Sequence, residues 1–402
     1  MVLRPIERAV RRAGIGIARR LLASKPLAPE AVDLAVLQRI VVVRQDRRLG
    51  NLVLLTSLLL GLRRAAPRAA ITVVAPHGFA PILESHPAVD RIIPLDHRRM
   101  LRRPWEMAAW RESLRAIQPE LAVDASPVHS ASFLNGLITW GSGAAWRLGY
   151  DREDAAGFLN LRVQSGAPAH ESVLLHDLLR YLHPDLPPAP PPRIETPVSD
   201  LALAARAYRR WGSGEERPVV GLHPGGRRRK RWPIERFEAV AGLLAARGVM
   251  VIVFSGPAEF ELIEAMAPPG PRRVYAPPTD IRGLRALVSG LDAFVSGDCG
   301  PMHLAAALGV PCVAIFRLGD HARYGPLGRG HRVLHRPEGE VEPEEVVEAV
   351  IDVLEARSPH ERLSVGELSM GEPSSRGRER HPTSGVAPAG RSSSPGMSES
   401  RR

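Results

Sequence analysis

The segment GDCGPMHLAAALGVP, residues 297–311, places polar side chains and two glycines at the entrance of an otherwise apolar helix. Pro301 suits the first helical position, because the N–H that proline lacks would have no partner there. A helix N-terminus offers free N–H groups and a partial positive charge, which favour an anion. His303 is then placed to donate to a phosphate oxygen, and Asp298 to cap the helix or hold a ligand hydroxyl or amine. The segment predicts an anion site, with a plain capped helix and a half-buried histidine as the alternative.

Two further stretches follow strand patterns and lead into helices. HPGGRRRKRWPIERF, residues 223–237, holds five consecutive basic residues at 227–231. These five cations cannot all reach one ligand, and we select Lys230 as the contact; a solvated loop is the alternative. SGPAEFE, residues 255–261, presents Glu259, whose carboxylate suits ribose hydroxyls, as acidic residues do in dinucleotide-binding folds. The alternative for Glu259 is an exposed glutamate that favours the helix dipole.

Strand-like and helix-like segments alternate twice along the chain, and this pattern must position these residues. The first series has strands at 40–44, 71–75, 91–95, 121–125 and 146–150, with helices at 51–64 and 104–117. After a helix at 199–211, the second series has strands at 219–223, 249–255, 272–276, 292–296 and 312–316, with helices from 233, from 280, after 297 and at 342–356. Such alternation predicts α/β architecture with two doubly wound parallel sheets. Ligands of these sheets bind beyond the carboxyl ends of the strands, so a cleft between the halves is the expected site.

The expected organisation has six parts. They are a basic amphipathic extension (1–38), an N-terminal Rossmann-like domain (39–182), a proline-rich join with a helix (183–214), a C-terminal Rossmann-like domain (215–336), a C-terminal helix (337–357) and a disordered tail (358–402). The tail is rich in Ser, Gly, Pro, Arg and Glu and has few apolar residues to bury.

Composition narrows the function classes. The chain has 402 residues, enough for two domains, and only two cysteines without metal-binding spacing, which fits a reducing cytosolic compartment. Aromatic residues make up 5%, which argues against a stacking surface for nucleic acid. The formal charge is +11, and residues 1–25 contribute +6 of it. That segment is neither a signal peptide nor a spanning helix; it predicts a membrane-surface contact or a packed extension, and both interpretations stay open.

The set HPG…KRWP…F, SGPAE and D-x-GPMHLAAALGVP resembles glycosyltransferase family 9, best known for bacterial heptosyltransferases of lipopolysaccharide core synthesis. The segment from IVVVRQDRRLGN onward is similar to the family's N-terminal part, and the resemblance covers about residues 39–357. It implies a GT-B fold of two facing Rossmann-like domains. It also implies a cytoplasmic enzyme, peripheral to the inner membrane face, that transfers heptose from ADP-heptose to a cell-surface glycan or glycolipid. Transfer is expected with inversion, without metal or cofactor, and nucleic acid is not expected as a partner.

The resemblance also implies roles for single residues. Lys230 and the helix N-terminus would stabilise the leaving diphosphate, and Glu259 would contact the ribose. The residues expected to bind substrate are His223, Gly225, Glu259, Asp298, Cys299, Gly300, Pro301, Met302 and His303. Cys299 stands where the family often has Thr or Ser, and a thiol is the weaker donor.

Asn51 departs from the family, which usually carries the catalytic Asp in this Gly-Asp pair. A carboxamide cannot take a proton from the acceptor hydroxyl at neutral pH. Asp46 in the same loop would supply the base, or His129 or Asp124 would; otherwise the protein binds sugar nucleotide or glycan and transfers poorly. We favour Asp46, with the impaired binding protein as the alternative function. A dehydrogenase is disfavoured, because no Gly-x-Gly-x-x-Gly follows the first strand of either half.

The loop FRLGD, residues 316–320, also departs from the family, which usually has GPT after this strand. The loop is placed to touch the nucleotide or the sugar, so the identity of the donor stays open. Arg317 would add positive charge toward the diphosphate.

Overall fold

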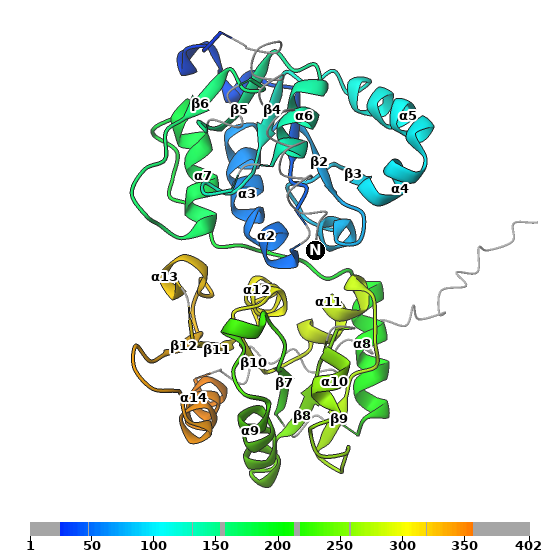
Figure 1. The fold of residues 1–402 in the computed structure, drawn as a ribbon, viewed down its shortest axis with the longest axis vertical. Helices are drawn as coiled ribbons and strands as arrows, with labels where there is room; N and C mark the ends of the chain where they lie inside the picture. Colours follow the sequence, from blue (N-terminus) through cyan, green and yellow to red (C-terminus); the bar gives the residue numbers. More distant parts are fainter. Residues whose placement is uncertain are drawn as a thin grey trace, which may run out of the picture. The chain divides into compact units, whose positions relative to one another are not determined.

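The computed structural model describes residues 25–356 apart from 47, 131, 153–156, 213–217, 257–258 and 319. Most of the expected basic helix at 1–25 and the whole expected tail lie outside these residues. Two six-stranded sheets organise the described part, and all their strand pairs are parallel (Figure 1). The α/β architecture with two parallel sheets is therefore confirmed.

The first sheet has the order β3-β2-β1-β4-β5-β6. Its strands are β1 (Arg39–Val43), β2 (Ala70–Pro76), β3 (Arg91–Leu95), β4 (Leu121–Asp124), β5 (Trp146–Tyr150) and β6 (Leu161–Val163). The central strand β1 is apolar and β-branched along most of its length, as expected for a strand that helices cover on both faces. The chain reverses its strand order between β1 and β4, which places the carboxyl ends of these two strands at a topological switch point.

Helices cover both faces of the first sheet (Figure 1). One face packs against α2 (Leu49–Leu54), α3 (Thr56–Ala65) and α7 (Glu171–Leu182), whose leucines form the largest apolar core. The other face packs against α4 (His97–Arg102), α5 (Pro104–Arg115) and α6 (Phe133–Gly141). Short 3₁₀ helices lie at Pro29–Ala31, Leu34–Val36 and Ala80–Leu83.

The second sheet has the order β12-β11-β10-β7-β8-β9. Its strands are β7 (Val219–His223), β8 (Met250–Val253), β9 (Arg273–Tyr275), β10 (Ala293–Gly297), β11 (Cys312–Phe316) and β12 (Arg332–His335). On one face lie α9 (Ile234–Ala246) and α14 (Pro343–Glu355); on the other lie α8 (Val198–Arg210), α11 (Ile281–Ser289) and α12 (Gly300–Ala307). The remaining helices are α10 (Phe260–Ile263), α13 (His321–Tyr324) and a 3₁₀ turn at Arg228–Lys230.

The two strands that the sequence did not predict are short or polar. Strand β6 has three residues with Arg162 at its centre, and β12 is an edge strand with exposed residues, so neither shows a continuous apolar run. The expected helix at 51–64 is two helices, α2 and α3, separated at Leu55. Helix α12 begins at Gly300, which makes Pro301 the second helical residue instead of the first.

Candidate functional site

Helices α2 and α12 approach closely at their N-termini, and two glycines allow this. A Cβ atom on Gly50 would lie 2.5 Å from Cδ2 of His303. A Cβ atom on Gly300 would lie 3.0 Å from Cβ of Leu49. Real Cβ contacts are essentially never as short as 2.5 Å and are rarely as short as 3.0 Å, so each glycine leaves the space that its neighbour on the other helix fills. The turn after β1 is therefore held directly against the turn after β10.

Several bonds join segments of the first sheet's half to segments of the second. Arg323 on α13 donates to Glu171 Oε2 at the start of α7, at 2.6 and 3.0 Å, and Glu171 is only 1% exposed. The next contact is between His170 Nε2 and the carbonyl oxygen of Gly325, at 2.9 Å. The buried Arg285 donates to the carbonyl oxygen of Pro81 at 3.0 Å. These contacts fix the strand ends of the two sheets toward each other.

A cavity of about 690 Å³ lies where these strand ends meet, large enough for a nucleotide-sized ligand. Its wall combines residues of both halves. The first half contributes Arg48, Leu49, Gly50, Asn51, Gly78, Phe79, Pro127, His129 and Ser130. The second half contributes, among others, His223, Gly226, Arg227, Lys230, Glu259, Thr279, Asp298, Cys299, Gly300, Pro301, His303, Arg323 and Tyr324.

The second half contributes cations to the cavity wall beside an equal number of carboxylates. Lys230 Nζ forms an ion pair with Asp298 Oδ2, with side-chain exposures of 28% and 13%. The same ammonium lies 5.9 Å from the ring centroid of Tyr324, and the guanidinium of Arg323 lies 5.1 Å from it. Asp298 does not cap α12, since its carboxylate is engaged by Lys230 and Cys299 holds the N-cap position. A diphosphate could therefore replace the Asp298 carboxylate as the partner of Lys230.

The first turn of α12 presents His303 and Cys299 as neutral groups. Burial lowers the pKa of His303 to about 4, although the nearby Asp298 opposes this, so the imidazole is neutral at pH 7. Burial raises the pKa of the Cys299 thiol to about 12. The thiol donates only a long contact of 3.7 Å to Ser296 Oγ. Both residues can offer hydrogen bonds to a ligand without carrying charge of their own.

Glu259 and His223 lie at the ends of β8 and β7. The Glu259 Oε2 atom accepts a hydrogen bond from the Gly256 N–H at 2.9 Å, which holds the carboxylate on the cavity wall. His223 is buried, and burial lowers its pKa; its Nδ1 lies 3.0 Å from the carbonyl oxygen of Phe254. Thr279, Asp280 and Ile281 continue the same wall beyond Glu259.

Asn51 lies on the cavity wall, and Asp46 lies behind it. The Asn51 Nδ2 atom donates to Asp46 Oδ2 at 3.0 Å, and Arg44 Nε donates to the same oxygen at 2.6 Å. The Arg48 N–H donates to Asp46 Oδ1 at 3.1 Å. Arg44 is 1% exposed and also donates to the Ala125 carbonyl oxygen. With Nδ2 held by Asp46, the Asn51 oxygen accepts no bond from the described residues and can accept one from a ligand.

The cavity wall includes nine of the twelve residues expected at the site. The other three are Asp46, Gly225 and Met302. Gly225 lies against the His223 ring, and Met302 is fully buried with Ala314 and Phe316. Of the alternative bases, His129 is exposed on the cavity wall, whereas Asp124 is fully buried and bonded by Ser126.

Among the cavity residues that sequence reasoning missed are Arg48, Arg323 and Tyr324, whose side chains carry charge or a hydroxyl. The signal for Arg48 was present, because it stands three residues before Asn51. Arg323 and Tyr324 lie beyond a loop whose direction the sequence does not indicate. Arg317, a candidate for added charge whose direction the sequence left open, is bonded away from the cavity to Glu340 and to the carbonyl oxygen of Arg231.

In the part of the chain that the structure describes, no three His, Cys, Asp or Glu side chains are grouped closely enough to hold a metal ion. Across the same residues, none of the helices has the length and apolar character needed to span a membrane.

Comparisons with known proteins agree with this architecture. Residues 107–349 match the family described as glycosyltransferase family 9 (heptosyltransferase). Lipopolysaccharide heptosyltransferase 1 of Escherichia coli K12 is 27% identical over 290 residues, which cover 68% of this chain and 86% of that protein. The crystal structure of a family 9 glycosyltransferase from Veillonella parvula superposes with a TM-score of 0.70 at 22% identity, over 80% of this chain and 98% of that one.

The structure of the ADP-heptose lipopolysaccharide heptosyltransferase II of Escherichia coli superposes with a TM-score of 0.67 at 25% identity. The superposition covers 79% of this chain and 98% of that one. These matches confirm the GT-B fold and the family resemblance seen in the motifs. The matched family spans more than half of the chain, and the chain therefore belongs to glycosyltransferase family 9, a family of glycosyltransferases.

Proposed function

We propose that this glycosyltransferase transfers heptose from ADP-heptose to a lipopolysaccharide-core or similar cell-surface acceptor, with inversion and without a metal. The observation that carries the proposal is that the N-terminus of α12, with Lys230, and the turn that holds Asn51 face the same cavity. Support for the sugar and the nucleotide comes from the relatives, whose names specify lipopolysaccharide heptosyltransferases and, in one case, ADP-heptose.

The donor diphosphate would bind at the N-terminus of α12. Lys230 would release Asp298 and pair with the phosphates, while the helix N–H groups and His303 donate to phosphate oxygens. Glu259 would accept hydrogen bonds from the ribose hydroxyls. Asp298, freed from Lys230, would accept a hydrogen bond from a sugar hydroxyl. Lys230, His303, Glu259 and Asp298 already line the cavity, and each would act on the donor through charge or hydrogen bonding.

The transfer would be a single displacement. The acceptor oxygen forms a bond to the anomeric carbon while the bond from that carbon to the diphosphate oxygen breaks, which inverts the configuration. Lys230 and the α12 N-terminus stabilise the negative charge on the leaving diphosphate. Asn51 would first align the incoming acceptor hydroxyl through its side-chain oxygen. The Asn51 side chain would then turn aside, and Asp46 would take the proton from the hydroxyl. Asp46 is the carboxylate that contacts Asn51, and its side chain is 26% exposed.

A second function is favoured by one observation. Asp46 does not line the cavity, and its oxygens accept bonds from Arg44, Asn51 and Arg48. If these bonds persist with acceptor bound, the base is missing. The protein would then bind a sugar nucleotide or glycan and transfer slowly, because general base catalysis contributes about 10²–10⁴-fold.

Two substitutions separate these functions in a transfer assay. In the enzyme with Asp46 as base, Asp46→Asn lowers the rate at least about 10²-fold. Asn51→Asp changes the rate little there, because two carboxylates about 3 Å apart cannot both ionise and act as one base. In the impaired binding protein, Asp46→Asn has no effect and Asn51→Asp raises the rate about 10²-fold or more. Loss of activity in His129→Gln alone would assign the base to His129.

The donor site is tested separately by thermal shift with ADP, GDP, UDP, dTDP and NAD. A ligand at about 100 times its dissociation constant adds about 2.7 kcal/mol to the free energy of unfolding. We expect a shift with ADP that is lost in His303→Ala and kept in the exposed-site control His321→Ala. A shift with another diphosphate alone would contradict the proposed nucleotide. The absence of any shift would contradict the donor site.

We further propose that the enzyme works in the cytoplasm at the inner face of the membrane, with residues 1–25 contacting the membrane. The net charge of +6 in that segment supports this location, since basic segments bind anionic lipid. Failure of the protein to pellet with anionic vesicles at low salt would contradict it.

A further inference from the structure

The pair of helices α4 and α5 carries a dense basic surface away from the cavity. Residues 97–115 contain six arginines and two glutamates, a net charge of +4. Glu106 pairs with Arg99 at 2.7 Å and with Arg103 at 3.1 Å. Arg98 and Arg102 have no carboxylate within 4.0 Å among the described residues. Arg98, Arg99, Arg102 and Arg103 line a second hollow of about 460 Å³ together with Asp96.

Large apolar side chains are exposed beside these arginines. Trp105, the second residue of α5, is 69% exposed, and Met107 is 41% exposed. Trp105 and the buried Leu114 are nine residues apart, about two and a half helical turns, so the indole points directly away from the core. Because 69% of Trp105 is exposed, most of its apolar ring meets water.

Helix α6 extends this surface on the same side of the sheet. Leu134 and Ile138 of α6 pack into the same core cluster as Trp110 and Leu114 of α5. The opposite side of α6 exposes Leu137 at 39% and Trp140 at 38%. Arg115 Nε donates to the Gly141 carbonyl oxygen at 3.4 Å, which joins the ends of the two helices. Helices α5 and α6 therefore pack one side against a common core and expose Trp105, Leu137 and Trp140 on sides that do not face it.

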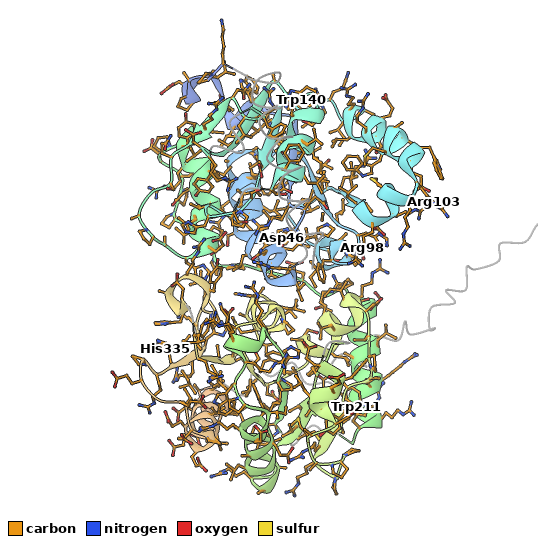
Figure 2. All side chains as sticks on the ribbon, in the orientation of Figure 1. Asp46, Arg98, Arg103, Trp140, Trp211 and His335 are labelled. Atoms are coloured by element: carbon orange, nitrogen blue, oxygen red, sulfur yellow. The ribbon has the colours of Figure 1, made fainter. Side chains whose placement is uncertain are left out.

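Figure 2 labels Arg98 and Arg103 on the α4–α5 pair and Trp140 on α6, all on the first sheet's half. We define the arginine–tryptophan surface as Arg98, Arg102, Trp105, Leu137 and Trp140. Met107 is not included, because it lies two helical turns before Leu114 and therefore on the core side of α5. Among the described residues, eleven large apolar side chains are exposed, and three of them belong to this surface, including the two most exposed tryptophans. This combination fits a partner with both anionic and apolar character.

We infer that the arginine–tryptophan surface docks on an anionic lipid bilayer. Arginines near a membrane surface are attracted to anionic headgroups, and tryptophan partitions to the boundary between headgroups and acyl chains. A bilayer satisfies both halves of this surface at once: the phosphates meet Arg98 and Arg102, and the acyl boundary receives Trp105 and Trp140. A nucleic acid would use the arginines but leave Leu137 in water. The inference rests on the proposed membrane location and is independent of the proposed donor and acceptor.

Vesicle co-sedimentation of the full chain tests the charge requirement. We expect binding to vesicles of phosphatidylglycerol and phosphatidylcholine and weaker binding to phosphatidylcholine alone. Arg98→Gln/Arg102→Gln should lower the partition coefficient about tenfold or more. The control Arg209→Gln/Arg210→Gln removes the same charge from exposed positions at the end of α8 and should stay within about twofold of wild type. Equal losses in both variants would overturn the inference.

Quenching of tryptophan fluorescence by brominated lipid tests insertion directly, even if residues 1–25 also bind the vesicles. We expect quenching in wild type that is reduced in Trp105→Phe and in Trp140→Phe, and unchanged in the control Trp211→Phe. Unchanged quenching in the first two variants would overturn the inference. Binding of an oligonucleotide that is lost in the double arginine variant and kept in both tryptophan variants would instead identify a nucleic-acid surface and overturn it.

Discussion

Each half of the molecule places an ion pair beside a helix entrance, but with opposite polarity. At α12, the cation Lys230 lies on the cavity wall with Asp298 as its partner, and both side chains are partly accessible. At α2, the cation Arg44 is 1% exposed, and its partner Asp46 is the accessible member at 26%. In the second half the cation of the pair, Lys230, therefore lies on the cavity wall, whereas in the first half the cation of the pair is buried and its carboxylate lies behind the Asn51 amide.

This difference assigns one chemical task to each half. An accessible ammonium next to a helix N-terminus suits a diphosphate leaving group. A carboxylate behind Asn51 suits a hydroxyl that must be aligned and deprotonated. The contact of Gly50 with His303 brings the two entrances together, so the reacting groups can meet only where the halves touch.

Replacement of Lys230 should lower the transfer rate more than any other substitution on the donor side. Lys230→Met removes the cation that faces the cavity, and we expect the transfer rate to fall about 10³-fold, as when a preorganised charge-stabilising group is lost. Arg229→Met is the matched control, because Arg229 belongs to the same basic run but is exposed and does not line the cavity. Steady-state transfer kinetics measure both, and a comparable loss in Arg229→Met would contradict the role given to Lys230.

The two halves can act on one pair of substrates only if the N-termini of α2 and α12 stay in contact. Glu171→Ala removes the 1% exposed partner of Arg323, and we expect the free energy of unfolding to fall by about 3 kcal/mol, as when one member of a buried pair is deleted. Urea denaturation measures this loss.

Glu84→Ala provides the exposed counterpart. Glu84 pairs with Arg282, and the two side chains are 38% and 52% exposed. Exposed pairs contribute at most about 1 kcal/mol, so this variant should change stability little. Similar losses in the two variants would show that burial does not distinguish the pairs.

The buried His303 should make stability depend on pH. Its pKa is about 4 in the folded protein against 6.5 unfolded, so the unfolded state binds more protons between these values. Stability is then complete above about pH 6.5 and is lost as pH falls toward 4, by up to about 3 kcal/mol from this residue. Burial also lowers the pKa of His86 to about 4, so protonation of His86 destabilises the folded protein in the same pH range.

His303→Gln should therefore flatten the dependence of unfolding free energy on pH between about 6.5 and 4. The exposed His321→Gln should leave the slope as in wild type. An unchanged slope in His303→Gln would mean that the imidazole is solvated, and thus that Gly50 does not cover it.

The strands of the two halves were equally predictable, since apolar runs such as β1 and β11 occur in both and one strand was missed in each. The cavity wall was more predictable in the second half, because the helix entrance at Gly300 has local chemistry that a motif preserves. Chain proximity suggested Asp46 as a wall residue. The structure places Asp46 behind Asn51, because the buried Arg44 at the end of β1 draws the carboxylate toward itself. An arginine that ends an apolar strand gives no sign of its burial in the sequence.

Arg323 and Tyr324 show the second kind of limit. Both lie on the cavity wall, yet Arg323 is held there by Glu171, 152 positions earlier in the chain. The motif that would have pointed to this loop is altered to FRLGD. Only the packing of α13 against α7 determines the direction of these side chains, and a single sequence contains no trace of that contact.

The smallest predicted effect concerns Cys299, the one donor-side residue whose chemistry is weaker than its position allows. Its thiol makes only a 3.7 Å contact to Ser296 Oγ, and burial keeps it protonated. A hydroxyl at the same place is a stronger donor and gains about 1 kcal/mol from one hydrogen bond, so Cys299→Ser should tighten ADP binding about fivefold. Cys299→Ala, which offers no donor, should not tighten binding. Calorimetric titration measures ADP binding by both variants. Equal affinities of the Cys299→Ser and Cys299→Ala variants would show that this side chain does not contact the diphosphate.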